Sequence, residues 1–524
     1  MPKVLIADSL SPDAVKVFKD RGVQADVKTG LKPDQLKAIL GEYDGLAVRS
    51  STKVTADVLT AATNLKVIGR AGIGVDTIDI DAATAKGIIV MNTPFGNSIT
   101  TAEHAIAMMM ALARDIPAAN ASTHAGKWEK NRFMGVELMG KTLGVIGCGN
   151  IGSVVADRAI GLKMKVIAYD PYLTPDRAAA IGVEKVELKD LFRRADFITL
   201  HTPLTDATRN LVDAKAMASM KKGVRIVNCA RGGLVVEADL KAAIESGQVA
   251  GAAFDVFETE PAKQHMFFGM EQIIATPHLG ASTTEAQEKV AVQVAEQMSD
   301  FLLSGAVVNA VNMPSVSAED APKLRPYMAL AEKLGSFAGQ LTQSAIKKVA
   351  IDYEGDACEL NTKPLTQALL KGLLSPVLEQ VNMVSAPLEA RSRGIDVVEA
   401  TRERSGDYHT LIRLTVTTEQ QIRSLAGTLF ADQPRLVECK GIALDAEFSP
   451  SMLYITNADK PGFVGNLGSL LGDAGINIAT FHLGRDKPGG NAIALLAVDG
   501  AMPEAILEKV RKLPQVVQAR TLKF

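Results

Sequence analysis

The sequence has few cysteines, and none of them lie close together. Its 524 residues include four cysteines without a C-x-x-C pair, namely Cys148, Cys229, Cys358 and Cys439. Such spacing argues against a zinc site and against a disulfide scaffold. We therefore expect a protein of the reducing cytoplasm that holds no metal ion.

Strong net charge and long apolar runs are also missing. The formal net charge is −2, so there is no general basic surface for nucleic acid, and any anion site must be local. The apolar run at 105–113 stops at Arg114 and is too short to span a bilayer. Residues 2–8 have the pattern of a strand and a turn rather than of a signal peptide. We expect a cytoplasmic protein with neither nucleic-acid nor membrane partners.

The chain is long and has the composition of an ordinary globular protein. With 47% hydrophobic and 22% charged residues over 524 positions, it is too long for one core, and we expect roughly two to four domains. Strand-like and helix-like segments alternate over 1–97, which is typical of a parallel, doubly wound sheet.

A glycine-rich turn follows an apolar strand at 143–146. Gly147, Gly149 and Gly152 have the G-x-G-x-x-G spacing that permits a tight turn, close approach of a pyrophosphate and close packing of helix on strand. A second apolar strand at 165–169 ends in Asp170, where an acidic residue would meet the adenine ribose. A carboxylate there repels a 2′-phosphate, so the pattern favours NAD over NADP.

Two arginines stand at the ends of successive predicted strands in the first region. Arg49 follows the strand at 45–48, and Arg70 precedes the turn that contains Gly72, Ile73 and Gly74. Either arginine alone is readily explained as a solvated loop charge. Because the carboxyl ends of parallel strands form one ligand-binding edge, the pair predicts an anionic substrate.

Polar residues also end the later strands, and three of them have a joint chemical logic. Oxidation of a 2-hydroxy acid needs a base near neutral pKa, which suits His278, and a forked cation for the carboxylate, which suits Arg231. Glu260 would orient the His278 ring and stabilise its protonated form. Each residue alone has a structural or turn role as its alternative, and the combination favours catalysis.

These motifs together resemble the D-isomer-specific 2-hydroxyacid dehydrogenases over about 1–310. The resemblance implies an NAD-binding domain at 98–285 inserted into a substrate-binding domain at 1–97 and 286–310, with Arg231, Glu260 and His278 catalytic. We expect the cofactor to contact Gly147, Gly149, Asn150, Ile151, Gly152, Asp170, Thr202, Cys229, Ala230, Asp255 and Gly280. We expect the substrate to contact Arg49, Arg70, Gly72 and Ile73.

The C-terminal part has a different character. Residues 452–524 follow a β-α-β-β-α-β order with Asp-Lys-Pro-Gly at the first turn, and they resemble an ACT domain, a ferredoxin-like regulatory module. This resemblance makes Asn457, Asp459 and Asn477 effector-site candidates at 451–524; the alternative is a module that only dimerises. Residues 311–450 have few motifs and resemble, by length and position, the intervening α/β domain of long-form D-3-phosphoglycerate dehydrogenases.

The combined resemblance implies oxidation of 3-phosphoglycerate to 3-phosphohydroxypyruvate with NAD, the first step of L-serine biosynthesis. It also implies a homo-oligomer, dimeric or tetrameric, with L-serine as a candidate effector. The segment at 126–133, which holds the single tryptophan, Trp128, is either a surface loop or a subunit contact. Two alternatives stay open: a dehydrogenase of another 2-hydroxy acid such as glycerate or 2-hydroxyglutarate, and an NADH-sensing co-repressor of the same fold.

Overall fold

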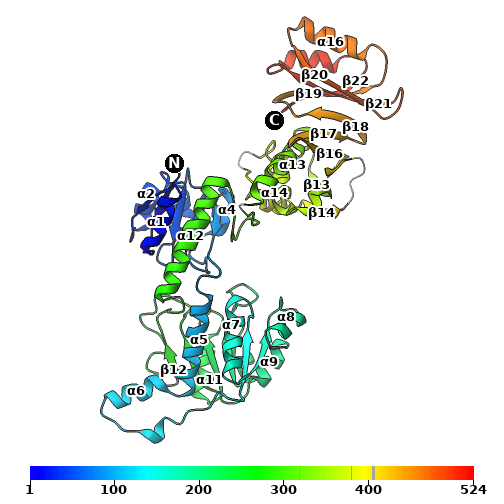
Figure 1. Cartoon of the computed structure of the whole chain (residues 1–524). Coiled ribbons are helices and arrows are strands. Elements are labelled where there is room, and N and C mark those ends of the chain that lie inside the picture. Colours follow the sequence, from blue (N-terminus) through cyan, green and yellow to red (C-terminus); the bar gives the residue numbers. More distant parts are fainter. Residues whose placement is uncertain (318, 379–380, 404–407) are drawn as a thin grey trace.

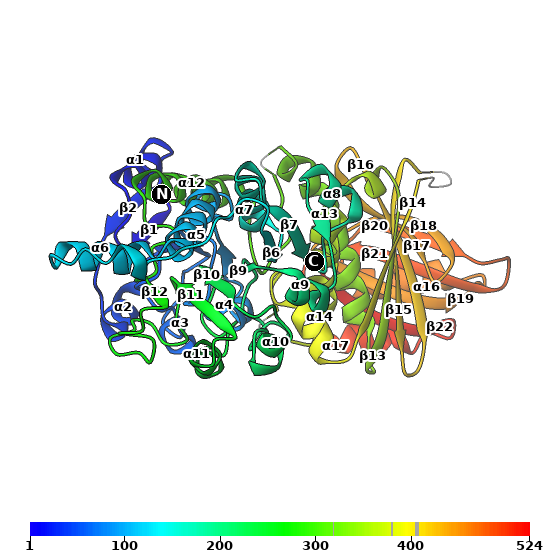
Figure 2. The same cartoon turned by 90° about the horizontal axis from the view of Figure 1, so that it is seen from below.

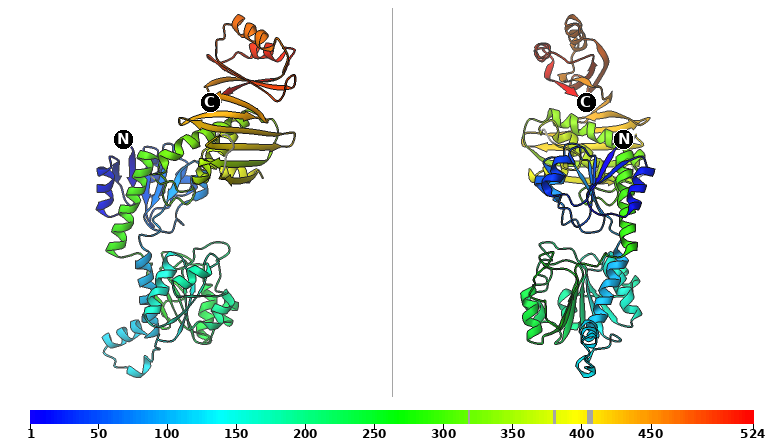
Figure 3. Two further views of the ribbon diagram at one scale, coloured as in Figure 1. Left: turned by 45° about the vertical axis from the view of Figure 1, so that its right-hand side comes forward. Right: turned by 90° about the vertical axis from the view of Figure 1, so that its left-hand side faces the viewer.

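The computed structural model describes residues 1–317, 319–378, 381–403 and 408–524, which form four β-sheets with flanking helices (Figure 1). The second sheet lies at one end of an elongated molecule and the fourth at the other (Figure 3). This confirms the predicted α/β class, with two doubly wound parallel-sheet regions followed by two smaller regions. Residues 318, 379–380 and 404–407 of the predicted 311–450 domain lie outside the described residues.

The first sheet is parallel throughout, with the strand order β2-β1-β3-β4-β5. Its strands are β1 (Lys3–Ile6), β2 (Gln24–Val27), β3 (Gly45–Val48), β4 (Val67–Arg70) and β5 (Ile89–Met91). Its helices are α1 (Pro12–Asp20), α2 (Pro33–Leu40), α3 (Ala56–Leu59) and α4 (Ile80–Ala85). The central strands are buried because apolar clusters cover both faces of the sheet, as expected when helices pack on each side.

A long helix from later in the chain completes this region. Helix α12 (Thr284–Ser304) lies beside α1 (Figure 2), and its buried residues Val290, Val294 and Met298 join the same apolar cluster as Val67. The chain thus returns through α12 to the first sheet region after completing the second sheet. Residues before and after the second sheet therefore belong to one core.

The second sheet is also parallel, in the order β12-β11-β10-β9-β6-β7-β8. Its strands are β6 (Thr142–Ile146), β7 (Lys165–Tyr169), β8 (Glu184–Lys185), β9 (Phe197–Leu200), β10 (Val224–Asn228), β11 (Val249–Phe254) and β12 (Ile273–Ala275). Its helices are α5 (Ser98–Ala113), α7 (Asn150–Gly161), α8 (Pro175–Ala180), α9 (Leu188–Arg194), α10 (Ala214–Ala218) and α11 (Glu237–Glu245). Helix α6 (Ile116–His124) and the short 3-10 turn η1 (Lys130–Arg132) belong to an arm that projects away from this sheet (Figures 1 and 2).

The third sheet is mostly antiparallel, in the order β14-β13-β15-β16-β17-β18, with only β13 and β14 parallel. Its strands are β13 (Ile346–Gly355), β14 (Asp396–Arg402), β15 (Thr410–Thr418), β16 (Ile422–Phe430), β17 (Gln433–Cys439) and β18 (Ile442–Glu447). Its helices are α13 (Ala321–Leu341), η2 (Asp356–Glu359), α14 (Thr362–Leu374) and α15 (Ala386–Ser392).

The fourth sheet is antiparallel, in the order β20-β21-β19-β22. Its elements are β19 (Ser451–Ala458), α16 (Phe463–Asp473), β20 (Ile478–Arg485), β21 (Asn491–Val498), α17 (Glu504–Arg511) and β22 (Val516–Lys523), so the predicted β-α-β-β-α-β order is confirmed. Its Tyr454 ring packs edge-on against Phe337 of α13 at 5.7 Å between ring centroids. The third and fourth sheets thereby share one apolar cluster.

Within the described part of the chain, every helix is too short or too polar to cross a bilayer.

Candidate active site

A cleft of about 670 Å³ opens between the first and second sheet regions. Arg49, Arg70 and Gly72 line it from the carboxyl ends of β3 and β4, and Glu260 and His278 line it from the loops after β11 and β12. The sequence places these residues far apart, and the two parallel sheets bring them to one opening. The structure thus joins predicted substrate residues with two of the three predicted catalytic residues.

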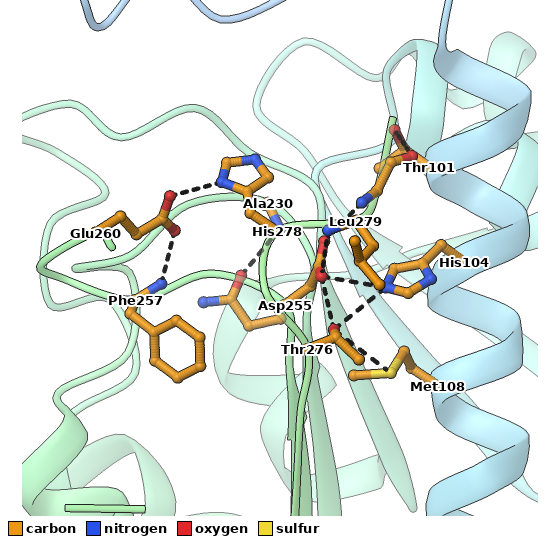
Figure 4. Close-up of polar contacts among 12 residues, drawn as sticks. Thr101, His104, Met108, Ala230, Asp255, Phe257, Glu260, Thr276, His278 and Leu279 are labelled. Atoms are coloured by element: carbon orange, nitrogen blue, oxygen red, sulfur yellow. Dashed lines mark hydrogen bonds and ion pairs between the residues drawn. The ribbon is translucent and has the colours of Figure 1, made fainter. Parts of the chain in front are cut away.

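His278 and Glu260 are in direct contact (Figure 4). The His278 Nδ1 donates to Oε2 of Glu260 at 2.7 Å, and Oε1 of Glu260 accepts the Phe257 amide at 3.0 Å. The hydrogen bond with the Glu260 carboxylate, outweighing burial, raises the pKa of His278 above its ordinary value. Burial alone would raise the pKa of Glu260, but its bonds to His278 and Phe257 bring that pKa below the ordinary value. A carboxylate beside an imidazole that binds protons readily is suited to reversible proton transfer at Nε2.

The loop that carries His278 is held by a buried carboxylate. Asp255 is fully buried, and its oxygens accept the Thr276 hydroxyl at 2.6 Å, the Leu279 amide at 2.7 Å and the Gly280 amide at 2.8 Å. His278 itself has a φ of 58°, in the left-handed region that a side chain seldom adopts. Asp255 therefore keeps a strained loop in place, which adds a positioning function to its predicted cofactor contact.

Sequence reasoning missed His104, which supports the same carboxylate from helix α5. Its Nε2 lies 3.3 Å from Oδ1 of Asp255 and 3.4 Å from the Thr276 hydroxyl (Figure 4). A single histidine within an apolar helix carries no spacing that would indicate this contact. Only the packing of α5 against β11 and β12 brings it there.

Arg231 makes no hydrogen bond to the other two predicted catalytic residues among the described residues, although its charge acts on the pKa of His278. It does not line the cleft that His278 and Glu260 share; together with Ile73 it lines a neighbouring hollow of about 540 Å³. Its Nε donates to Oδ2 of Asp76 at 3.0 Å and its Nη1 to the Ala230 carbonyl at 2.7 Å. All three residues follow adjacent strands of the second sheet, β10, β11 and β12, at one edge; His278 contacts Glu260 there, and Arg231 faces a loop of the first region.

The predicted arginines form a concentrated positive group. Arg70 is partly buried; its buried Nε lacks a partner among the described residues, and its Nη1 donates to the Ala71 carbonyl at 3.2 Å. Burial, followed by the nearby charges of Arg231 and Arg49, lowers the pKa of Arg70 to about 10. An anion in the cleft would relieve this repulsion, so the geometry suits a substrate with more than one negative charge.

The glycine-rich turn has the shape that a dinucleotide requires. Gly147 has a φ of 88°, and a Cβ there would lie 2.6 Å from the His201 carbonyl oxygen. A Cβ at Gly152 would overlap the Gly147 carbonyl oxygen, whereas Gly149 faces open space with no atom within 4 Å. The first and third glycines thus permit close packing, and the second leaves room for a phosphate.

Asp170 lies directly behind this turn. Its Oδ2 accepts the Cys148 amide at 2.8 Å and its Oδ1 the Tyr172 amide at 2.8 Å, so the carboxylate is held at the end of β7. The remaining predicted cofactor residues follow the carboxyl ends of other strands of the same sheet: Asn150, Ile151, Thr202, Cys229, Ala230 and Gly280. This edge therefore has the turn, the helix N-terminus and the acidic residue that NAD needs.

The effector candidates in the fourth sheet each have an internal partner. Asp459 accepts Nη1 of Arg485 at 2.9 Å and the Gly489 amide at 2.9 Å. Asn477 donates to Asp499 at 2.7 Å. Asn457 is buried; its Nδ2 donates to the Ala458 carbonyl at 3.1 Å, and its Oδ1 is unpartnered among the described residues. Their effector function stays a prediction.

Three family models match the chain in succession. Residues 106–280 match the NAD binding domain of D-isomer specific 2-hydroxyacid dehydrogenases, 323–440 the D-3-phosphoglycerate dehydrogenase intervening domain, and 451–515 the ACT domain. These matches agree with the three resemblances found in the sequence.

Curated relatives match over the whole length. A D-3-phosphoglycerate dehydrogenase of Synechocystis sp. is 45% identical, covering 100% of this chain and 95% of the relative. The Bacillus subtilis enzyme of the same name is 41% identical, covering 100% and 99%. Among solved structures, D-lactate dehydrogenase from Aquifex aeolicus in complex with NAD and lactic acid is similar with a TM-score of 0.53 and 26% identity, covering 60% of this chain and 100% of that one. Apo D-lactate dehydrogenase from Escherichia coli has a TM-score of 0.53 and 28% identity, covering 59% and 99%.

Proposed function

The chain belongs to the D-3-phosphoglycerate dehydrogenases, and from this premise we propose that it oxidises 3-phospho-D-glycerate to 3-phosphohydroxypyruvate through His278, Glu260 and Arg231. It is an NAD-dependent oxidoreductase that serves L-serine biosynthesis. The observation that carries the residue assignment is the 2.7 Å contact of His278 with Glu260 at a cleft also lined by Arg49 and Arg70.

Proton transfer falls to His278. With Nδ1–H donated to Glu260, the neutral ring presents Nε2 as an acceptor for the proton of the substrate C2 hydroxyl. The glycine-rich turn would hold NAD, whose nicotinamide would supply the acceptor for the hydride of C2. The C2–O bond thereby becomes a carbonyl, and the proton rests on His278 as an imidazolium that the Glu260 carboxylate stabilises.

The arginines bind the two ends of the substrate. Arg231 retains N–H donors for the C1 carboxylate, because its hydrogen bonds to Asp76 and Ala230 use only two of five. Arg49 and Arg70, on the opposite side of the cleft from His278, bind the phosphate at C3. A substrate anchored at both ends holds its C2 hydroxyl between them, which is the geometry that general-base catalysis needs.

A side-by-side substrate assay tests the proposed function. Purified enzyme is supplied with NAD and either 3-phospho-D-glycerate, D-glycerate or D-2-hydroxyglutarate, and NADH formation is followed by absorbance; 2-oxoglutarate with NADH tests the reverse direction. We expect the phosphorylated substrate to give the highest kcat/KM. Preference for another acid would contradict the substrate assignment, and the absence of any turnover would favour an NADH-sensing co-repressor.

The domain roles and the assembly belong to the same proposal. Residues 1–97 and 286–310 bind substrate, 98–285 bind NAD, 311–450 connect, and 451–524 bind a small effector such as L-serine. The arm after α6 exposes Trp128, Met134 and Met139, with 88%, 77% and 74% of their surface accessible. Such exposed apolar side chains favour a contact between subunits of a homo-oligomer, which light scattering would detect.

A further inference from the structure

Arg231 is a catalytic candidate that links the first and second sheet regions through its side chain. It follows β10 of the second sheet, yet its guanidinium reaches Asp76, which lies in the loop between β4 and α4 of the first region. The ion pair spans 3.0 Å between Nε and Oδ2. Asp76 is thus an acidic side chain of the substrate region that contacts the proposed carboxylate-binding arginine directly.

Two bonds fix the guanidinium and leave part of it free. Nε donates to Asp76, and Nη1 donates to the Ala230 carbonyl. Asn228 stabilises the backbone here, because its side chain donates to the Arg231 carbonyl and accepts the Ala230 amide. A guanidinium has five N–H donors in a rigid plane, so three remain, two on Nη2 and one on Nη1. The three free N–H donors are enough to bind a carboxylate in a bidentate manner. The two donors that are already used keep the plane of the guanidinium fixed.

The backbone of the same loop makes room for this arrangement. A Cβ at Gly74 would overlap Nη2 of Arg231 and would lie 2.8 Å from Oδ2 of Asp76. The φ angle of Gly74 is not positive, so the backbone at this position would accept alanine. Glycine at position 74 is therefore needed to leave space for the Arg231 side chain, and it is not needed for the backbone conformation of the loop.

Charge adds a second reason for an acidic residue at this place. Arg231 and Arg49 both lower the pKa of Arg70, whereas Asp76 acts in the opposite direction. Without Asp76 the three guanidinium groups would repel one another before substrate arrives, and Arg231 would lose the ion pair that opposes this repulsion.

We propose that Asp76 is a positioning residue that holds Arg231 against the first sheet region in the orientation that receives the substrate carboxylate, with Gly74 supplying the space. This inference rests on the proposed function, in which Arg231 binds that carboxylate. Asp76 itself touches neither the hydroxyl nor the hydride, so its effect is exerted through Arg231.

The test compares Asp76→Asn, Asp76→Glu and Gly74→Ala with the wild type. We expect Asp76→Asn and Gly74→Ala to raise KM for 3-phospho-D-glycerate about tenfold or more, with a smaller change in kcat, because a carboxylate contact made in both ground and transition states is weakened. Melting temperatures and NADH affinity measured by calorimetry should stay near the wild-type values. Asp76→Glu, which retains the charge, should recover part of the loss. Asp81→Asn, an exposed acid at the start of α4, is the matched control for charge alone.

Two inhibitors separate positioning from a general structural effect. Oxamate has a carboxylate and no phosphate, whereas inorganic phosphate has no carboxylate. In the presence of NADH, Asp76→Asn should weaken oxamate about as strongly as it raises KM and should leave inhibition by phosphate unchanged. Equal weakening of both probes, or an unchanged oxamate affinity, would overturn the proposal. Wild-type enzyme without activity on 3-phospho-D-glycerate would instead contradict the proposed function, while oxamate binding would still report on Arg231.

Discussion

Nδ1 of His278 lies 2.7 Å from Oε2 of Glu260, and this contact joins the loop after β12 to the loop after β11. It leaves Nε2 of the ring without a partner among the described residues. One carboxylate thereby sets both the tautomer and the proton affinity of the residue that we assign as the base.

Replacing Glu260 with glutamine should shift the pH dependence of both reaction directions. Oxidation needs neutral His278, so its kcat/KM rises with pH through the pKa of His278; reduction needs the protonated ring and falls through the same pKa. The Glu260 carboxylate raises that pKa, so Glu260→Gln should move both limbs to lower pH. Initial rates across pH measure the shift, and Glu258→Gln, an exposed neighbour, is the control. Unshifted limbs would show that His278 is not the titrating group.

Replacing His278 with alanine should remove most turnover. Loss of a positioned general base costs roughly 10²–10⁴-fold in kcat. The side chain is half-exposed at the cleft and is not one of the residues expected to contact NAD, so NADH binding measured by calorimetry should change little. Turnover close to that of the wild type would contradict the assignment.

Much of this architecture could be predicted from the sequence because its signals are local. The strand before Gly147, the acidic residue at Asp170 and the alternation of apolar segments require only neighbours in the chain. The convergence of Glu260 with His278 followed from a general property of parallel sheets, whose carboxyl ends share an edge. These inferences needed no knowledge of how the two halves of the molecule meet.

The contacts that escaped prediction depend on that meeting. Asp76 and Arg231 are 155 positions apart and come from different sheets, so no spacing rule connects them. His104 reaches Asp255 only because α5 packs across the second sheet. Asp255 was predicted to contact the cofactor. Its hydrogen bonds with the Leu279 and Gly280 amides were not predicted, because they depend on the fold of a loop without regular periodicity.

Replacing Arg49 with alanine should weaken recognition of the substrate phosphate more than recognition of the rest of the substrate. Its side chain lines the cleft, and the backbone around it is held by Asp8, which accepts the Arg49 amide at 2.6 Å and the Thr52 hydroxyl at 2.7 Å. The variant should therefore fold normally. We expect kcat/KM for 3-phospho-D-glycerate to fall roughly 10–100-fold, as for other lost charge-assisted contacts, and that for D-glycerate to change far less. Lys53→Ala, an exposed cation nearby, is the control, and equal losses on both substrates would argue against a phosphate contact.

The two glycines of the cofactor turn should fail in different ways when replaced by alanine. A methyl group at Gly152 would overlap the Gly147 carbonyl oxygen, a backbone atom that cannot move without opening the turn. Overpacking of this kind costs about 1–3 kcal/mol, so Gly152→Ala should lower the melting temperature. Gly149→Ala meets no protein atom within 4 Å and should leave the melting temperature unchanged. It should still weaken NADH binding, because the methyl group occupies the space reserved for the pyrophosphate. Calorimetric titration with NADH beside a thermal melt measures both quantities. A Gly149→Ala protein with wild-type NADH affinity would show that the pyrophosphate does not approach the turn at this residue.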